Sequence, residues 1–294
     1  MRFGTVEGDS GPLVVAADGD AAVLMTEFRD VEAVLGADSA QVPLPGARVD
    51  PAGLSWLPPV LRPGKVLCVA LNNSANPERI ISGPDTPAMF VKPSSSLVGH
   101  GRPIRIRPED GRVHPEPELA VLIGRGGANI PEKTALSHVF GYTILNDVTS
   151  PTMRGQDTFH YRAIHPGTDG GVRYVESWVS YPARYKGADT FGPLGPWVVT
   201  ADEIPDPHDL RITCSHNGNL ITDDTTANLR FSVAEVISYA SRYLALEPGD
   251  VIGMGTALRN SGGAVQNVDL NRLGGQVEVS IEGIGTLSNP VERR

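Results

Sequence analysis

Apolar residues along this chain gather in short runs that are separated by turns containing Gly and Pro. Runs of this kind, bounded by turn residues, are typical of β-strands. Before residue 62 the pattern predicts strands over 1–6, 11–17 and 20–25 and a short helix over 30–35. Beyond residue 62 the predicted strands are 65–71, 88–93, 103–108, 118–124, 141–147, 196–201, 210–217, 250–256 and 276–283.

Few helices interrupt these strands. The segment 231–246 predicts the clearest one, because Ser232 and Glu235 have capping-box spacing. Its apolar stripe is predicted to pack in the core and consists of Val233, Val236, Ile237, Ala240 and Leu244. A second short helix is predicted over 131–139, with Pro131 at its first position. Strands without regularly alternating helices predict an α+β, mostly β fold and argue against a doubly wound nucleotide-binding fold.

The chain composition changes at the Pro-rich segment 54–64. We therefore predict a boundary near residue 62, between a small accessory β-rich domain (1–62) and a larger domain (63–294) that carries the chemistry. Two cysteines, Cys68 and Cys214, fall within predicted strands. Buried free thiols are the favoured interpretation, over a disulfide or a catalytic pair.

Charge and targeting features narrow the possible partners. The formal net charge of −9 argues against nucleic acid or an anionic membrane surface as a partner. No apolar stretch approaches the roughly 20 residues needed to cross a bilayer. The first residues lack the charged and apolar regions of a signal peptide. We expect a cytoplasmic protein.

Three carboxylates stand at the ends of two apolar strands. Glu116 and Glu118 are two residues apart where a strand begins, so their side chains project to the same face. Asp147 ends another apolar strand about thirty residues later. Three carboxylates could form a site for a hard cation, and oxygen ligands favour magnesium, manganese or calcium over zinc. Spacing alone leaves open the simpler interpretation of a solvated, charged face.

Several blocks of the sequence resemble the fumarylacetoacetate hydrolase family in the same order. They are HPEPELAVLIG, GYTILNDVT, KGADTFGPLGPWVVTADEIPDPHDL, HNG, FSVAEVISYASRYLALEPGDVIGMGT and GGQVEVSIEGIGTLSNPV, and they span about 62–291. The resemblance implies a catalytic domain of mixed β-sheets rolled into a sandwich-like barrel. It also implies a homodimer and one Mg²⁺, or alternatively Mn²⁺, in each active site.

The resemblance assigns roles by position. The metal ligands fall on Glu116, Glu118 and Asp147. Lys186, before the DTFGPLGP block, would supply positive charge beside a developing enolate. The family substrates resemble 2-oxo acids with a second carbonyl group.

Two residues after the PGDVI block complete this assignment. Gly255 and Thr256 would bind the substrate carboxylate. From the residues alone, an ordinary turn at 255–256 explains the sequence equally well, and an ordinary surface lysine is the favoured interpretation of Lys186.

The sequence departs from the family in the segment that carries the water-activating histidine and glutamate. This chain reads LNNSANPER there, so Asn72 matches a substrate-binding asparagine, but Asn76 stands at the histidine position. Arg79 stands at the glutamate position, and Glu78 is displaced by one residue. An amide cannot accept a proton at neutral pH, so the usual water activation is missing. Asn76 could still orient a water or a carbonyl, and Glu78 could serve as the base.

Further changes affect the remaining pocket. Ile221 and Thr222 replace an arginine–glutamine pair of the family, and the arginine after NDV is also replaced. His114 could support the carboxylates as a hydrogen-bond partner. The segment 158–171 is either an ordinary polar loop or the source of a substitute acid or base, and its candidate residues are His160, Tyr161, Arg162, His165 and Asp169.

Three functional hypotheses follow. The first is a metal-dependent hydrolase that cleaves a C–C bond in an acylpyruvate-like or 2,4-dioxo acid through a metal-bound enolate. The second keeps the enolate chemistry without the water, as a decarboxylase, isomerase or tautomerase, lyase or cyclase acting on a β-dicarbonyl acid. The third is a non-catalytic homologue that binds a metal or metabolite. We take hydrolysis as the primary prediction, with the second class as its close alternative.

Overall fold

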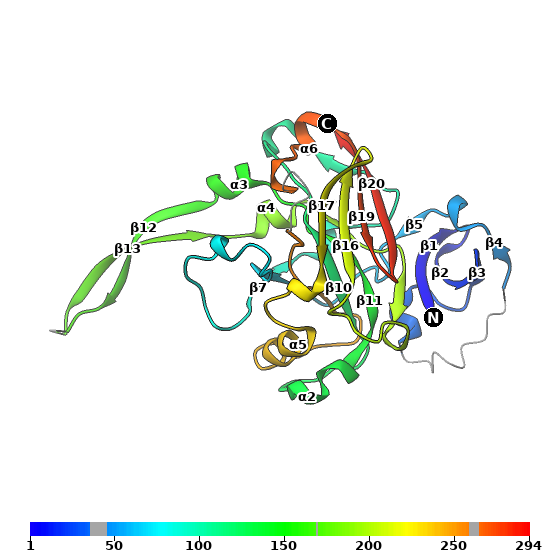
Figure 1. Cartoon of the computed structure of the whole chain (residues 1–294), viewed down its shortest axis with the longest axis horizontal. Helices are drawn as coiled ribbons and strands as arrows, with labels where there is room; N and C mark the ends of the chain where they lie inside the picture. Colours follow the sequence, from blue (N-terminus) through cyan, green and yellow to red (C-terminus); the bar gives the residue numbers. More distant parts are fainter. Residues whose placement is uncertain (36–45, 169, 259–264) are drawn as a thin grey trace.

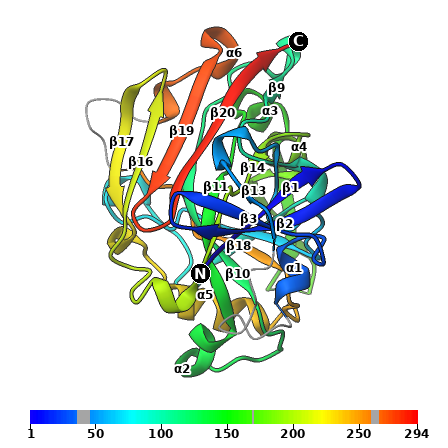
Figure 2. The same cartoon turned by 90° about the vertical axis from the view of Figure 1, so that its right-hand side faces the viewer.

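The computed structural model describes residues 1–35, 46–168, 170–258 and 265–294. One large mixed sheet runs through the molecule, in the order β4-β3-β2-β1-β15-β11-β10-β18-β6-β7, with β5 paired to β1 (Figures 1 and 2). Its strands are β1 (Arg2–Gly8), β2 (Gly11–Asp18), β3 (Ala21–Met25), β4 (Arg48–Val49), β5 (Trp56–Leu57), β6 (Val66–Ala70), β7 (Ala88–Lys92), β10 (Pro117–Ile123), β11 (Val139–Asn146), β15 (Val198–Thr200) and β18 (Val251–Gly253).

A second sheet of five strands faces the middle of the first. Its order is β17 (Asn219–Thr225), β16 (Arg211–His216), β19 (Gly275–Ile281), β20 (Gly285–Arg293) and β9 (Ile104–Ile106). Two small pairs complete the strands, β8 (Leu97–Val98) with β14 (Gly192–Pro193), and β12 (Thr158–Pro166) with β13 (Val172–Ser180). The α-helices are α1 (Val31–Val34), α2 (Glu132–Ala135), α3 (Pro151–Gln156), α4 (Ala183–Gly187), α5 (Val233–Ser241) and α6 (Leu270–Leu273).

The central strand β10 is buried along its whole length because both of its faces are covered. Leu119 and Val121 face a core shared with β16, β19 and α5. Ala120 and Leu122 face a second core, shared with β1, β2 and β3. A strand buried on both faces holds its ends rigidly, and the predicted carboxylates lie at one of those ends.

The structure confirms the mostly-β prediction and every strand predicted beyond residue 62. It also confirms the helix near residue 30 and the Ser232–Glu235 capping box at the start of α5. Both cysteines are buried and free. The strands before residue 62 are hydrogen-bonded to the rest through the β1–β15 pair, and the domain boundary near residue 62 stays a prediction.

Three local predictions were wrong. Pro131 precedes the first turn of α2 rather than opening it. Leu244 lies beyond the end of α5 and is exposed, so it does not belong to the core stripe. The segment 158–171 is mostly strand β12 rather than a loop, and together with β13 it forms a ribbon that extends from the body (Figure 1). Asp169, a candidate in that segment, lies outside the described residues.

None of the helices among the described residues is both long and apolar enough to cross a membrane. The cytoplasmic location stays a prediction.

Candidate active site

The antiparallel pairing of β10 and β11 brings the three predicted carboxylates together. Pro117 at the start of β10 lies opposite Asn146 at the end of β11, so the residues flanking this pair are neighbours. The backbone N–H of Asp147 donates to the Glu116 carbonyl at 2.8 Å. Carboxylate oxygens of Glu116, Glu118 and Asp147 all lie within 4.8 Å of one another. We call these three residues the carboxylate cluster.

The chain after β18 holds two of the cluster's side chains. The Gly255 N–H donates to Glu118 Oε2 at 3.1 Å, and the Thr256 hydroxyl lies 2.9 Å from Glu116 Oε2 and 3.3 Å from Glu118 Oε1. Gly255 has φ +97°, and a Cβ there would lie only 2.8 Å from the Asn72 Cβ. Glycine is therefore required at this turn for conformation and for space. The predicted substrate-binding roles of Gly255 and Thr256 stay predictions.

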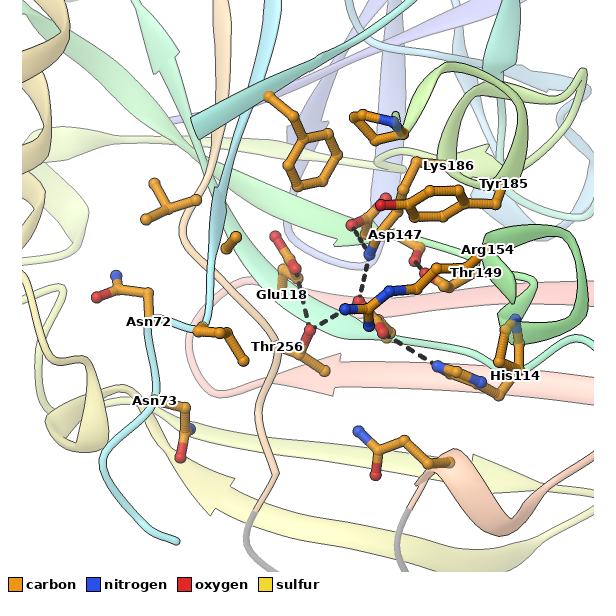
Figure 3. A pocket seen from close by; sticks show the side chains of 18 of the residues that line it. Asn72, Asn73, His114, Glu118, Asp147, Thr149, Arg154, Tyr185, Lys186 and Thr256 are labelled. Carbon is orange, nitrogen blue, oxygen red and sulfur yellow. Dashed lines mark hydrogen bonds and ion pairs between the residues drawn. The ribbon is translucent and has the colours of Figure 1, made fainter. Parts of the chain in front are cut away.

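Two lysines approach the cluster from the other side (Figure 3 shows Lys186). Lys186 Nζ, from α4, lies 2.6 Å from Glu116 Oε2 and 2.5 Å from Asp147 Oδ2. Lys92, at the end of β7, is fully buried, with its Nζ 2.7 Å from Asp147 Oδ1. Lys92 also donates to the Lys186 carbonyl. Asp147 is therefore held between two ammonium groups.

The pKa values within the cluster diverge because of these contacts. Burial alone would raise the pKa of Glu116, but Lys186 and the His114 ring, 3.0 Å away, hold it well below its usual range. Burial, followed by repulsion from Asp147, raises the pKa of Glu118 well above its usual range. Burial would lower the pKa of Lys186, but Asp147 and Glu116 outweigh it and raise that pKa, so the ammonium form persists. The predicted partnership of His114 with the carboxylates is confirmed.

This donor set fits a divalent cation. The ionised cluster would carry three negative charges, whereas Lys92 and Lys186 contribute two positive charges. Burial and then repulsion from Asp147 raise the pKa of Glu118, so a cation beside it would favour its charged form. Three oxygen donors at this spacing, with room beside them in the pocket, suit Mg²⁺ or Mn²⁺.

The cluster opens into a pocket of about 530 Å³. Arg154, from α3, points into this pocket in Figure 3. Its guanidinium makes no hydrogen bond or ion pair with any residue that the structure describes. Arg79 and Arg112 also line the pocket. The sequence prediction did not include Arg154, although an arginine seven residues after Asp147, on a helix capped by Ser150, was a signal for it.

The residues predicted in the lid segment lie farther from the cluster. Asn72 lines the pocket, but its amide bridges backbone groups, donating to the Phe231 and Met254 carbonyls at 3.1 and 2.8 Å and accepting from Phe231 N–H at 2.7 Å. Asn76 donates to the Leu258 carbonyl at 3.1 Å. Neither Asn76 nor the exposed Glu78 lines the described part of the pocket. The catalytic roles of Asn76 and Glu78 and the substrate-binding role of Asn72 stay predictions.

The candidate acids and bases in β12 are not at the pocket. His160, Tyr161, Arg162 and His165 are all exposed on the ribbon, and none of them lines the described pocket. His160 instead stacks on Trp178 with ring centroids 3.9 Å apart. The prediction that this segment could supply a substitute acid or base finds no support within one chain.

The sequence matches the family described as fumarylacetoacetate (FAA) hydrolase, C-terminal, over residues 65–292. The chain belongs to the fumarylacetoacetate hydrolase family. It is an enzyme of that family, whose relatives include hydrolases, isomerases and tautomerases. The hypothesis of a non-catalytic homologue is therefore set aside.

Three relatives illustrate this range. A mitochondrial oxaloacetate tautomerase of Xenopus laevis is 35% identical over 241 residues, covering 82% of this chain and 69% of the relative. The structure of a 5-carboxymethyl-2-hydroxymuconate delta-isomerase from Mycobacterium smegmatis is 30% identical, with TM-score 0.73 and coverage of 100% and 99%. A maleylpyruvate hydrolase from Sphingobium, solved with manganese(II) and pyruvate, is 26% identical, with TM-score 0.71 and coverage of 100% and 99%.

The cluster's role as a cation site can be tested with Glu118→Gln, which keeps the side-chain size and removes one charge. We expect the affinity for Mn²⁺ to fall about tenfold or more, because a neutral amide is a weaker ligand for a hard cation. Isothermal titration calorimetry measures this affinity. Glu132→Gln, on the exposed surface of α2, is the matched control and should bind as the parent does. Equal affinity in Glu118→Gln and the parent would contradict the assignment.

Proposed function

We propose that this enzyme interconverts the enol and keto forms of a 2-oxo dicarboxylic acid of the oxaloacetate type, with Mg²⁺ or Mn²⁺ as cofactor. The observation that carries the proposal is the contrast between two parts of the site. One part is the carboxylate cluster with Lys186, and the other is the lid segment 71–79. Lys186 and the carboxylate cluster make direct contacts, whereas Asn76, at the position of the water-activating histidine, donates to the Leu258 carbonyl and does not itself line the described pocket. Tautomerisation requires the carboxylate cluster and Lys186, but it requires no activated water.

The chemistry depends on negative charge that develops on the 2-oxo oxygen. A divalent cation held by Glu116, Glu118 and Asp147 would polarise that group and stabilise the enolate. Lys186 adds a fixed positive charge beside the position of the 2-oxo oxygen. That charge stabilises the transition state electrostatically. In the enol-to-keto direction the enol oxygen loses a proton and C3 gains one. Lys186 Nζ acts as a fixed positive charge, because its raised pKa keeps it in the ammonium form and makes it a poor proton donor. Water takes the proton from the enol oxygen and supplies the proton that C3 gains.

A dicarboxylate suits the charge of the pocket. Its lining carries three carboxylates against four cationic groups, which are Arg79, Arg112, Arg154 and Lys186. Adding a divalent cation makes the pocket strongly positive inside a chain of net charge −9. Since the Arg154 guanidinium has no described protein partner, it is free to hold the carboxylate farther from the reacting carbon in a bidentate pair.

C–C bond hydrolysis is the second candidate. Its support is the maleylpyruvate hydrolase among the structural relatives, which was solved with manganese(II) and pyruvate. Hydrolysis would need a base in the lid segment to activate water. None of the lid residues that line the described pocket is such a base. Decarboxylation would use the same enolate stabilisation, and it differs from tautomerisation in releasing carbon dioxide.

The first test follows the ultraviolet absorbance of enol-oxaloacetate with Mg²⁺, in parallel with carbon dioxide release. We expect faster ketonisation without stoichiometric carbon dioxide. Lys186→Met should reduce kcat about 100-fold or more by removing the fixed positive charge beside the enolate. The same variant should bind Mn²⁺ at least as tightly as the parent, because a competing ammonium is gone. Full activity in Lys186→Met, or carbon dioxide matching the enol consumed, would overturn the proposal.

The Arg154 assignment makes a separate prediction. Arg154→Gln should raise KM for a dicarboxylic substrate about tenfold or more with little change in kcat, because a carboxylate contact common to ground and transition states is lost. A monocarboxylic 2-oxo acid should be affected far less. Arg242→Gln, exposed just after α5, is the control. An equal effect on both substrates would show that Arg154 does not recognise the second carboxylate.

The hydrolytic alternative is tested with Asn76→His, which restores the missing base type. We expect this variant to gain C–C hydrolysis of an acylpyruvate that the parent leaves intact, detected as two acid products by chromatography. Asn76→Gln keeps an amide and should gain nothing. Efficient cleavage by the parent itself would favour hydrolysis as the natural reaction.

A further inference from the structure

A buried carboxylate outside the carboxylate cluster lies next to the pocket without lining it. Asp224, in β17, is 3% exposed, whereas the neighbouring Asp223 points to the other face of the strand and pairs with Arg211 at 2.7 Å. Burying a carboxylate costs free energy, which hydrogen bonds must offset. The role of Asp224 is therefore understood from the groups that its two oxygens bind.

The Oδ2 atom of Asp224 joins two segments that are far apart in the sequence. It accepts hydrogen bonds from the Asn73 side-chain amide at 2.9 Å and from the Leu258 N–H at 2.8 Å. Asn73 belongs to the lid segment, Leu258 follows β18, and both residues line the pocket. Figure 3 shows Asn73 next to Asn72 on the lid. One oxygen atom therefore sets the distance between two parts of the pocket wall.

The Oδ1 atom anchors the same carboxylate to the end of β17. It accepts hydrogen bonds from the Thr225 N–H at 2.8 Å and from the Asn228 side-chain amide at 2.6 Å. The Asn228 carbonyl in turn accepts from the Ser74 N–H at 2.8 Å and from the Ser74 hydroxyl at 2.9 Å. The lid is thus bound to this end of the sheet through Asn73 and also through Ser74.

The segment 256–258 connects this anchor to the carboxylate cluster. At one end the Thr256 hydroxyl lies within hydrogen-bond distance of two carboxylates of the cluster. At the other end the Leu258 N–H is held by Asp224, and the Leu258 carbonyl accepts from Asn76 of the lid at 3.1 Å. The lid and this segment therefore form a wall whose position is fixed relative to the cluster.

We propose that Asp224 is a positioning residue, which holds the lid segment and residues 256–258 together as a wall that is ordered before the substrate binds. Asp224 does not touch the substrate, because it is not among the residues that line the described pocket. Its effect is on substrate binding, since a wall that is already ordered loses less conformational entropy when a ligand binds. The effect on the substrate rests on the proposed function, whereas the order of the wall does not.

Hydrogen exchange with and without the Asp224 anchor tests the order of the wall. Asp224→Asn keeps the side-chain size, but its NH₂ group cannot accept the hydrogen bonds that one of the two oxygens accepts in the parent. We expect lid amides over 72–76 to exchange about tenfold or more faster, with exchange in β10 unchanged. Asp223→Asn makes the same chemical change on the other face of β17, and its exchange should match that of the parent.

Kinetics distinguish positioning from a general loss of structure. With enol-oxaloacetate and Mg²⁺, Asp224→Asn should raise KM about tenfold and change kcat less than about threefold, because the carboxylate cluster and Lys186 are intact. The affinity of this variant for Mn²⁺, measured by isothermal titration calorimetry, should equal that of the parent. A residue that only stabilised the fold would affect kcat and Mn²⁺ affinity together with KM.

A second variant removes the same hydrogen bond from the lid side. Asn73→Ala leaves the buried strand unchanged, so it tests the proposal even if Asp224→Asn does not fold. We expect smaller changes of the same kind in lid exchange and KM. The double variant should resemble Asp224→Asn, since both substitutions act on one hydrogen bond.

Unchanged lid exchange in both variants, an equal effect of Asp223→Asn, or a loss of kcat and Mn²⁺ affinity in Asp224→Asn would overturn the positioning role. A parent protein without activity on enol-oxaloacetate would overturn the proposed function alone, because hydrogen exchange and Mn²⁺ binding do not depend on that substrate.

Discussion

Repulsion among three carboxylates at the edge of a buried sheet is the constraint on which this site depends. Glu118 and Asp147 are almost wholly buried, where water cannot screen their charges. The two lysines compensate part of this charge, and the glycine–threonine turn after β18 supplies further donors. The fold can hold such a cluster because β10 is packed on both faces, so its end cannot move to relieve the repulsion.

The remaining charge imbalance gives the site its chemistry. In our proposal a cation completes the cluster, and Lys186 and Arg154 leave positive charge facing the space where an anionic substrate would lie. The lid segment is held in place by side-chain hydrogen bonds, because Asn72 donates to the Phe231 carbonyl and Asn73 donates to the buried Asp224. In the proposed function, the carboxylate cluster and Lys186 stabilise an enolate, and the lid segment supplies no activated water.

Local pattern in the sequence identified three carboxylates that could form a cation site, and the family resemblance was needed to favour that site over a solvated, charged face. Alternation along a strand put Glu116 and Glu118 on one face, and a second strand end supplied Asp147. The family resemblance was needed for Lys186, which looks like a surface residue in a turn. Lys92 was missed because its burial depends on β7 lying beside β6 and on α4 covering it, which are contacts between distant segments. The ribbon of β12 and β13 was missed because histidines and arginines break the apolar alternation of a ribbon whose two faces are both exposed.

The most direct test of the account is a crystal structure with Mn²⁺ and oxalate, which mimics the enolate of a 2-oxo acid. The account predicts an anomalous peak for manganese among Glu116, Glu118 and Asp147, with two oxalate oxygens on the metal and Lys186 Nζ beside the oxalate. Oxalate bound without manganese, or manganese bound away from these three carboxylates, would contradict it.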